Sequence, residues 1–440
     1  MNRKERFDLA HWTVDRALKA GADQAAVGLN FARRIEIEFR DKKLDKLQEA
    51  TENGLYLEVY VQQRYSGQST NDLKKDSLER FIQDAVASTK YLTKDEFRSL
   101  PDPRYYPALS QGQLKLLDES YSGIETPDRV KMASAIEAAA AAESDQIIST
   151  TAGYNDARSE AVRVHSNGFE GEEESTSFSA GAEVTVKDGE SGRPEDWFYA
   201  TTRFRNELPD PGELGKNAAH RALRKIGQKK LESGRYVMIV ENRAGGRLLG
   251  AMFAPMSGWA LQQKSSFLEG MLGKKIASEK LTVIDDPFVE KGLGSRFFDG
   301  EGLAAKRRVV IEKGVLRQYF IDNYYGKKLG MEPTSGGPSN ILFDYGTRSL
   351  EEMIAGVKRG ILVTGFIGGN SNSTTGDFSF GIVGLLIEGG KTVSPVNEMN
   401  ITGNMKEFWN QLSDVGNDPY PYSSMRIPSL LFEGVNFSGL

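Results

Sequence analysis

Histidine and cysteine supply many of the nucleophiles, bases and metal ligands of enzymes, and this chain is poor in both. It has three histidines and no cysteine among 440 residues. The absence of cysteine excludes thiolate nucleophiles, disulfides and thiolate-bound zinc. The sequence also lacks H-E-x-x-H, G-x-S-x-G, the phosphate-binding loop and an EF-hand. We expect His11 to pack on the apolar stripe of a helix, His165 to end a strand and His220 to lie on a basic helix face.

Carboxylates are the remaining candidates for acid, base or cation chemistry. The pair Asp285-Asp286 and the pair Asp299 and Glu301 have the oxygen ligands that a hard cation prefers. Asp-Pro and Asp-Gly sequences are equally typical of turns, and we expect turns here. A hydrolase that works with carboxylates alone would require Asp285, Asp299, Glu301 and Asp377 to converge in space.

A segment between residues 365 and 381 combines glycines with small polar side chains. Glycine lets a second backbone approach closely, and serine, threonine and asparagine offer hydrogen bonds without bulk. This composition suits recognition of an extended peptide by strand addition, and an irregular surface loop is the alternative. The candidate groove residues are Gly368, Gly369, Asn370, Ser371, Thr375, Gly376, Asp377, Phe378 and Ser379.

Basic side chains are concentrated between Lys216 and Lys230. The preceding Asp210-Pro211 is typical of a helix start, with aspartate as the cap and proline in the first turn. The chain carries a net charge of −5, so it has no overall attraction for nucleic acid. Basic residues of an amphipathic helix usually face solvent. We therefore expect no tight nucleic-acid binding, and any weak contact with DNA would use this helix.

No apolar run approaches the ~18 residues of a membrane span. The N-terminus is charged and no apolar stretch follows it. These observations predict a soluble, cytoplasmic protein without membrane contact.

Periodicity predicts an α+β protein of three units. Residues 1–100 have a helix over Phe7–Leu18, alternating strands joined by a turn at Asn53-Gly54 and a helix over Leu73–Val86, which is an N-terminal α/β unit with antiparallel hairpins. Three prolines between residues 101 and 107 indicate a linker. A central α+β segment over 108–231 contains an alanine-rich helix over Val130–Ala142 and two long strands. Residues 234–440 are predicted to form a β-rich domain with many glycines.

Nearly the whole chain resembles the TldD/PmbA family, which is described both as metallopeptidases and as modulators of DNA gyrase. The resemblance rests on segments that occur in the family's order. They are Leu55–Gln62, His165–Phe169, Lys264–Leu268, Phe298–Gly302, Lys328–Gly330, Ser335–Gly337, Thr375–Phe380, Leu386–Lys391, Val415–Asp418 and Pro428–Leu431.

The resemblance implies two kinds of subunit with the same fold. TldD-like chains carry a zinc-binding H-E-x-x-x-H on a helix after the first strand of the third domain, and a cysteine ligand near the C-terminus. Here Gly250 and Pro255 stand where the histidines would be, Ala251 stands where the glutamate would be, and residues 418–426 contain no cysteine. Such side chains supply neither zinc ligands nor a base. This sequence therefore resembles the PmbA (TldE) type, and we expect no cofactor in it.

The expected function is a pseudo-enzyme subunit that completes a peptidase whose zinc lies in a TldD-like partner. The resemblance implies a heterodimer that acts on peptide substrates in proteolysis and peptide maturation, and a homodimer is an option in isolation. A DNA gyrase-associated or nucleic-acid-associated regulator and an independent carboxylate-based hydrolase are the alternatives. We expect the chain to be inactive as a peptidase by itself.

Overall fold

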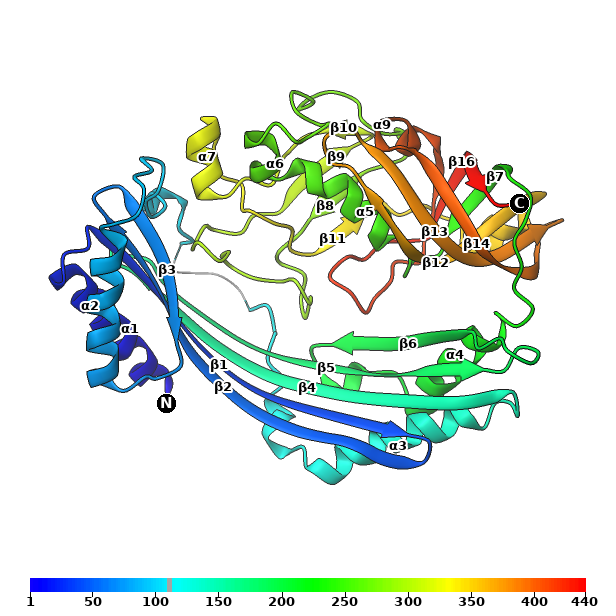
Figure 1. The fold of residues 1–440 in the computed structure, drawn as a ribbon, viewed down its shortest axis with the longest axis horizontal. Coiled ribbons are helices and arrows are strands. Elements are labelled where there is room, and N and C mark those ends of the chain that lie inside the picture. The colour runs from blue at the N-terminus through cyan, green and yellow to red at the C-terminus, as the bar shows by residue number, and fades with distance from the viewer. Residues whose placement is uncertain (109–112) are drawn as a thin grey trace.

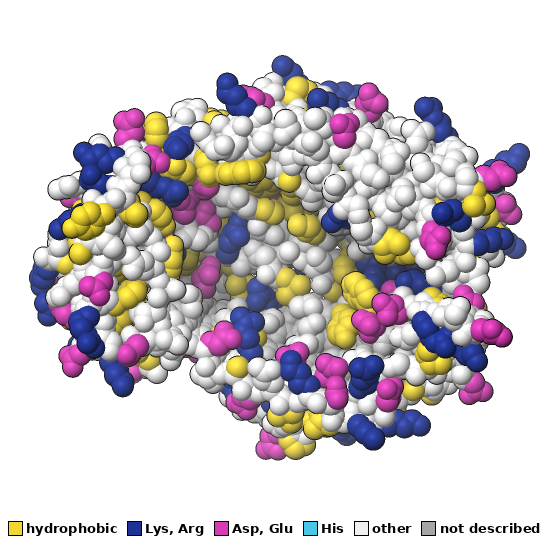
Figure 2. All heavy atoms as spheres, in the orientation of Figure 1, with side chains coloured by type: hydrophobic (Ala, Val, Ile, Leu, Met, Phe, Trp, Pro, Cys, Tyr) yellow, Lys and Arg dark blue, Asp and Glu magenta, His cyan; other side chains and the backbone are white. Residues whose placement is uncertain are grey.

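The computed structural model describes residues 1–108 and 113–440 (Figure 1). The space-filling view shows a central hollow (Figure 2). One side of the hollow is a long, curved sheet, and the other side is the C-terminal region. The sheet is antiparallel with the strand order β3-β2-β1-β4-β5-β6. Its strands are β1 (Gln24–Arg40), β2 (Lys43–Val61), β3 (Arg64–Thr70), β4 (Ile147–His165), β5 (Glu170–Val186) and β6 (Glu195–Thr202).

Four helices cover the convex face of this sheet (Figure 1). They are α1 (Arg3–Lys19), α2 (Lys75–Thr89), α3 (Thr126–Ala141) and α4 (Pro211–Leu223). The apolar sides of α1 and α2 pack on one end of the sheet, and those of α3 and α4 pack on the other end. The capping box of Asn2 and Glu5 starts α1, and Gly21 with a φ of 103° follows it. The predicted helices are confirmed.

The turn between β1 and β2 differs from the prediction. It lies at Asp41 and Lys42, which have φ values of 45° and 67°. Asn53 and Gly54 lie inside β2, opposite Phe31 and Asn30 of β1. The Asn-Gly signal is local, whereas the pairing of β2 with β1 along its length fixes the register. The prediction of a turn at Asn53-Gly54 is therefore wrong.

The long sheet is continuous across the proline-rich segment that follows residue 100. β1 pairs with β4 from Ala26 opposite His165 to Arg40 opposite Thr151. Strands from residues 1–100 and strands from the following segment thus belong to one sheet. The side chains of this sheet contribute to two separate apolar clusters. Residues 109–112, at the start of the predicted central unit, lie outside the described residues.

The C-terminal region is rich in strands, as predicted, and the α+β class is confirmed. Its main sheet has the order β14-β13-β12-β7-β16-β15, and β14 also pairs with β16, which closes a barrel-like ring. A smaller sheet has the order β10-β9-β8-β11. The strands are β7 (Gly234–Val240), β8 (Val283–Asp285), β9 (Arg308–Glu312), β10 (Val315–Leu316), β11 (Ile341–Phe343), β12 (Arg359–Ser371), β13 (Asp377–Glu388), β14 (Lys391–Asn404), β15 (Leu412–Val415) and β16 (Leu430–Ser438).

Short helices connect these strands. They are α5 (Gly246–Phe253), α6 (Gly258–Gln262), α7 (Asn323–Leu329), α8 (Leu350–Ala355) and α9 (Met405–Phe408). The largest apolar cluster of the protein lies between the two C-terminal sheets and includes the fully buried Trp409. In the described ranges, no helix is long and apolar enough to cross a bilayer.

Candidate functional site

The positions of the degenerate zinc motif lie on and just after α5, which follows β7. Gly250 is exposed, and a Cβ atom added there would have no neighbour within 4 Å. Ala251 is 7% exposed, and Pro255 is buried in the turn that ends the helix. The solvent-facing side of α5 is formed instead by Arg247, Gly250 and Ala254. The helix therefore presents an open surface of small residues beside one arginine.

This helix does not fit a hydrolytic zinc ion. Such an ion requires three protein ligands and a base for its water, and the side chains of Gly250, Ala251 and Pro255 provide no ligand atom. Over residues 1–108 and 113–440, no group of three or more histidine, aspartate or glutamate side chains is placed to hold a metal ion. No chemical step at this helix can therefore be assigned to zinc held by this chain.

The glycine-rich segment forms the ends of β12 and β13 rather than an irregular loop. A bulge interrupts the pairing between Ile367 and Asn370, and Gly368 and Gly369 adopt φ values of 60° and 78° there. A Cβ atom at Gly369 would lie 2.1 Å from the carbonyl oxygen of Ser379. At least one glycine of the segment is thus required by the hairpin itself. Near the tip, residues 370–373 and 377–379 line a hollow of about 550 Å³.

Arg247 connects α5 to this hairpin. Its Nη2 donates a hydrogen bond to the carbonyl oxygen of Gly369 at 2.6 Å, and its guanidinium lies 4.8 Å from the centre of the Phe380 ring. A second connection runs through the backbone amide of Phe267, which donates to the carbonyl of Ser373 at 2.8 Å. The structure therefore brings the degenerate motif and the candidate groove together on one surface.

The four carboxylates that a zinc-free hydrolase would need do not converge. Asp285 is buried, accepts a hydrogen bond from the backbone amide of Ser339 and pairs with Arg308 at 2.8 Å. Asp299 accepts the backbone amides of Glu301 and Leu303, which is a turn. Asp377 is exposed at the hairpin and binds the side chains of Thr375 and Asn404. The predicted turn is confirmed at Asp299, whereas Asp285 ends strand β8, so the expectation of a turn at that residue is wrong.

A network of polar side chains, here called the histidine junction, surrounds the end of β4. It consists of Glu58, Tyr106, Arg163, His165 and Asn167. Arg163 Nε donates to His165 Nε2 at 2.9 Å, so this nitrogen is an acceptor and the ring proton lies on Nδ1, which donates to the Tyr106 hydroxyl at 3.1 Å. The hydroxyl donates to Asn167 at 2.8 Å. Burial and the neighbouring Arg163 lower the pKa of His165 to about 3.

Glu301 lies near this junction and holds the C-terminal region against the N-terminal segment. It accepts the backbone amide of Asn323 at the start of α7, and the Asn323 side chain donates to the carbonyl of Ser99 at 2.9 Å. Burial raises the pKa of Glu301 to about 7, with smaller contributions from the charges of Asp299 and Asp322. The protonated form is thus accessible near neutral pH.

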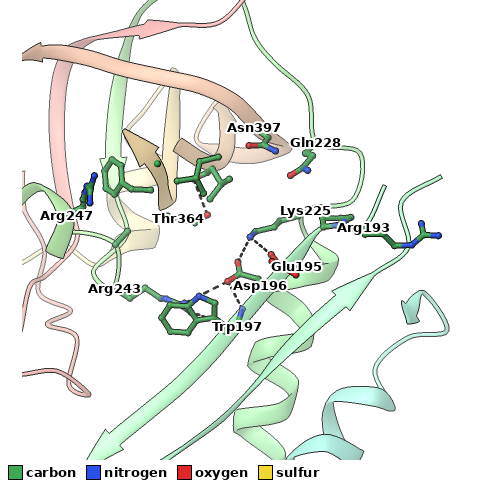
Figure 3. Close-up of a pocket in the computed structure, with 17 residues that line it drawn as sticks. Arg193, Glu195, Asp196, Trp197, Lys225, Gln228, Arg243, Arg247, Thr364 and Asn397 are labelled. Atoms are coloured by element: carbon green, nitrogen blue, oxygen red, sulfur yellow. Dashed lines mark hydrogen bonds and ion pairs between the residues drawn. The ribbon is translucent and has the colours of Figure 1, made fainter. Parts of the chain in front are cut away.

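A second network, here called the arginine junction, joins α4 and β6 to the C-terminal region. Asp196 and Glu241 are its acids, and its cations are Arg221, Arg224, Lys225 and Arg243. Arg221 reaches both oxygens of Glu241 at 2.7 and 2.9 Å. Lys225 lies 3.2 Å from Asp196 (Figure 3). Burial lowers the pKa of Arg224, Lys225 and Arg243, although the acids of the junction oppose this effect.

The arginine junction corrects the prediction of a solvent-facing basic helix. Arg221 is 8% exposed, and Arg224 and Lys225 are only partly exposed. Lys216 and His220, in contrast, are exposed as predicted. The basic side chains behave differently because the end of α4 meets the C-terminal region, which the sequence pattern could not show.

His11 is a second correction. Its side chain is 47% exposed, and its Nε2 lies 3.2 Å from a carboxylate oxygen of Glu170. The expected packing of His11 on the apolar stripe of α1 is wrong, because the apolar face of the helix is formed by Leu9, Ala10, Val14 and Ala17.

Comparisons with known proteins agree with this architecture over the whole chain. Residues 25–89, 119–226 and 233–439 match family models described as domain 1, the central domain and the C-terminal domain of PmbA/TldA metallopeptidases. A crystal structure of a candidate modulator of DNA gyrase from Bacteroides thetaiotaomicron VPI-5482 is 47% identical, covers 100% of both chains and has a TM-score of 0.97. The chain belongs to the PmbA/TldD family.

Other members of the PmbA/TldD family are more distant. Metalloprotease PmbA of Escherichia coli O157:H7 is 28% identical over 428 residues, which are 95% of this chain and 93% of that protein. The crystal structure of TldE from Thermococcus kodakarensis is 23% identical, covers 98% of this chain and 100% of that chain, and has a TM-score of 0.87. This last likeness shows a shared fold.

The structure gives a physical role to one segment that carried the resemblance to the PmbA/TldD family, residues 298–302. The ring of Phe298 lies 5.1 Å from the ring of Phe169. A Cβ atom added at Gly171 would lie 2.6 Å from the Phe298 ring. Gly302 has a φ of 80°, and its added Cβ would lie 3.1 Å from His165. The segment thus packs on the end of β4 and on the histidine junction, where larger residues would not fit.

Sequence reasoning missed Arg247 and both junctions. Arg247 stands three residues before Gly250 in the degenerate motif, and this spacing could have placed it on the same helix face. The pairing of Asp196 with Arg221 and Arg243 left no such signal, because these residues come from three separate elements.

Proposed function

We propose that this chain is a non-catalytic, PmbA (TldE)-like subunit of a TldD-type zinc metallopeptidase complex that acts in proteolysis and peptide maturation. The observation that carries the proposal is the chemistry of α5. Gly250, Ala251 and Pro255 occupy positions where a zinc peptidase needs two ligands and a base. In this proposal, zinc and the bound water are supplied by a TldD-like partner.

The surface around α5 supports a role in assembly. Gly250 and Ala254 leave the helix face open, Trp259 of α6 is 55% exposed, and the β12–β13 hairpin adjoins the helix through Arg247. Exposed aromatic residues beside small ones are typical of protein interfaces. We infer that this surface meets the partner subunit and borders the path of the peptide. Because related subunits present similar surfaces, a homodimer could form through it when the partner is absent.

A role as a DNA gyrase-associated regulator has less support. Two solved structures that resemble this chain are named as candidate modulators of DNA gyrase, which describes those proteins. In this chain the basic side chains that favoured DNA contact include Arg221 and Lys225, which are engaged with Asp196 and Glu241. No specific observation favours this function over the first one.

The test is co-expression with a TldD-like chain, followed by size exclusion, zinc analysis and cleavage of an unfolded peptide. We expect a mixed complex with about one zinc per pair, cleavage by the complex and none by this chain alone. Ala254→Arg should weaken assembly at least about tenfold, since it places a charge in a packed interface. Ala87→Arg, at an exposed alanine of α2, is the matched control and should assemble normally.

Two results would contradict the proposal. One is stoichiometric, chelator-resistant zinc in the isolated chain. The other is a partner that cleaves equally fast alone while no mixed species elutes.

Phe378 of the candidate groove is unsuitable for a test of assembly by substitution. Its side chain is 5% exposed, and its ring lies 5.3 Å from that of Phe380 within the core.

A further inference from the structure

A cleft lies between the start of β6 and the middle of β12, beside the arginine junction (Figure 3). Residues 193–197 form one wall and residues 364–368 the other, and the volume is about 620 Å³. Lys225, Arg243 and Arg247 also line this β6–β12 cleft. Its size lies in the range of ligand sites, and its two walls are stretches of extended chain.

The cleft carries an excess of positive charge. Arg193, Lys225, Arg243 and Arg247 line it, against Glu195 and Asp196. Lys225 and Arg243 share the single buried carboxylate of Asp196 with Arg221. Over the described ranges, Arg247 forms no ion pair within 4.0 Å, although it binds the Gly369 carbonyl. The protein's own acids therefore leave cations in this cleft without full neutralisation.

Hydrogen bonding next to the cleft is incomplete as well. Arg221 Nε and Arg224 Nη2 are buried and, among the described residues, have no hydrogen-bond partner. Their closest carboxylate oxygens, on Asp196 and Glu241, are both 3.6 Å away. Buried donors without acceptors are costly and uncommon in native proteins. An additional anion at the cleft would offset part of the excess positive field around them.

The two walls differ in the backbone groups that they offer. Along β6, the carbonyls of Glu195, Trp197 and Tyr199 already accept side-chain hydrogen bonds from Lys225, Arg243 and Tyr420. Along β12, the pairing with β7 ends at Val363, so the strand beyond that residue is paired with β13 alone. The carbonyls of Thr364 and Gly369 accept side-chain hydrogen bonds from Arg221 and Arg247. A ligand backbone can thus approach β12 between these two residues, while β6 contributes mainly side chains.

Two exposed apolar side chains belong to the lining of the cleft. Trp197 and Ile367 both line it and are 47% and 48% exposed. They offer contacts to aliphatic or aromatic groups of a ligand, beside the cations. A compact inorganic anion would use the cations only, and a nucleic acid would meet Glu195 and a net charge of −5.

We propose that the β6–β12 cleft binds an extended peptide that carries carboxylate side chains. The glutamate or aspartate groups of the peptide pair with Lys225 and Arg247, its apolar side chains contact Trp197 and Ile367, and its backbone lies along β12. This site belongs to the isolated chain and requires no partner subunit. It is therefore independent of the proposed function.

The test measures fluorescence anisotropy of a labelled peptide in which glutamate alternates with valine, with the isolated chain. A peptide of the same length with glutamine in place of glutamate is the control ligand. We expect the glutamate peptide to bind at least about tenfold more tightly. Raising the salt from about 0.05 M to about 0.3 M should reduce this difference.

Three variants connect the binding to the cleft. Lys225→Gln and Arg247→Gln should each weaken the glutamate peptide about tenfold and leave the glutamine peptide unchanged. Lys216→Gln removes the same charge from an exposed position of α4 outside the cleft and should bind like the parent. Thermal unfolding of each variant shows whether it is folded. If the Lys225 variant is unfolded, the peptide affinity of the Arg247 variant still tests the proposal.

Several outcomes would overturn the proposal. They are equal binding of the two peptides, unchanged binding in both cleft variants, and binding of inorganic phosphate or a DNA oligonucleotide where the glutamate peptide does not bind. Failure of this test leaves the co-expression experiment unaffected. A chain that binds the peptide but forms no mixed complex would contradict only the proposed function.

Discussion

The two polar junctions connect the long sheet to other parts of the chain, but they differ in how completely their groups are satisfied. In the histidine junction, Arg163, His165 and Tyr106 form an ordered chain of donors and acceptors that ends at Asn167. In the arginine junction, four cations share Asp196 and Glu241, and two buried nitrogens have no partner in the described structure.

The difference separates a structural contact from a candidate binding site. A buried network with every group paired can only hold its surroundings in place, because a ligand would have to break bonds that are already made. A network with excess charge next to an open cleft can gain by binding an anion. Family membership does not draw this distinction.

The largest expected effect is on the arginine junction. Asp196→Asn keeps the shape of the side chain but leaves the surrounding cations with Glu241 alone, so we expect the free energy of unfolding to fall by about 3 kcal/mol. Urea unfolding monitored by circular dichroism measures this loss. Glu172→Gln, which removes a carboxylate from an exposed pair with Arg3, is the control and should cost less than about 0.5 kcal/mol. Equal losses in the Asp196 and Glu172 variants would show that the two acids contribute alike to stability. The cations of the junction would then not depend on Asp196 for neutralisation.

The histidine junction and Glu301 should give opposite pH dependences. The pKa of His165 is about 3 in the folded protein and 6.5 for an ordinary histidine, so the unfolded chain binds the extra proton and stability is lost as pH falls below 6.5. The pKa of Glu301 is about 7 instead of 4.5, so the folded protein keeps the proton and stability is lost as pH rises from 4.5 to 7.

Variants separate these two contributions. His165→Asn should flatten the loss of stability on the acid side, and Glu301→Gln should flatten the loss towards neutral pH, each within the range between the two pKa values given for that group. The measurement is the unfolding free energy at a series of pH values, relative to the parent chain. Curves parallel to that of the parent would mean that neither group titrates differently on folding.

The smallest expected effect concerns the exposed part of α4. Lys216→Ala should change the unfolding free energy by less than about 0.5 kcal/mol, because this side chain is exposed, whereas Arg221 on the same helix is buried against Glu241. Thermal or urea unfolding measures it against the Asp196 variant. A loss comparable to that of Asp196→Asn would contradict the division of α4 into a solvent-facing part and a buried part.

Local patterns predicted much of the fold. The apolar spacing of Phe7–Leu18 and the cap at Asp210 predicted α1 and α4. The alternation of residues predicted parts of β1 and β2, and β4 and β5 were expected as two long strands. The turn at Asn53-Gly54 failed because strand pairing overrode a local preference. The C-terminal region was predicted only as rich in strands, since its ring depends on contacts such as β14 with β16 that no local pattern encodes.

The candidate site was predictable where chemistry is carried by residue type. The side chains of Gly250, Ala251 and Pro255 lack ligand atoms in any structure. Their inability to bind zinc could therefore be predicted from the sequence. The contact of Arg247 with Gly369 could not, because it joins a helix to a hairpin more than a hundred residues later. The same holds for Asp196, whose partners come from α4 and from the segment after β7.

The order of strands in the long sheet has a consequence for synthesis on the ribosome. β1 lies between β2 and β4 in the sheet. β2 follows β1 directly in the sequence, whereas β4 is synthesised on the order of 100 residues later. At about 5–20 residues per second, the free edge of β1 waits for several seconds or longer. During this interval the nascent chain exposes a long unpaired edge beside the apolar face that α3 will cover. Chaperones that shield such edges would act in this window, before β4 arrives and the sheet becomes complete.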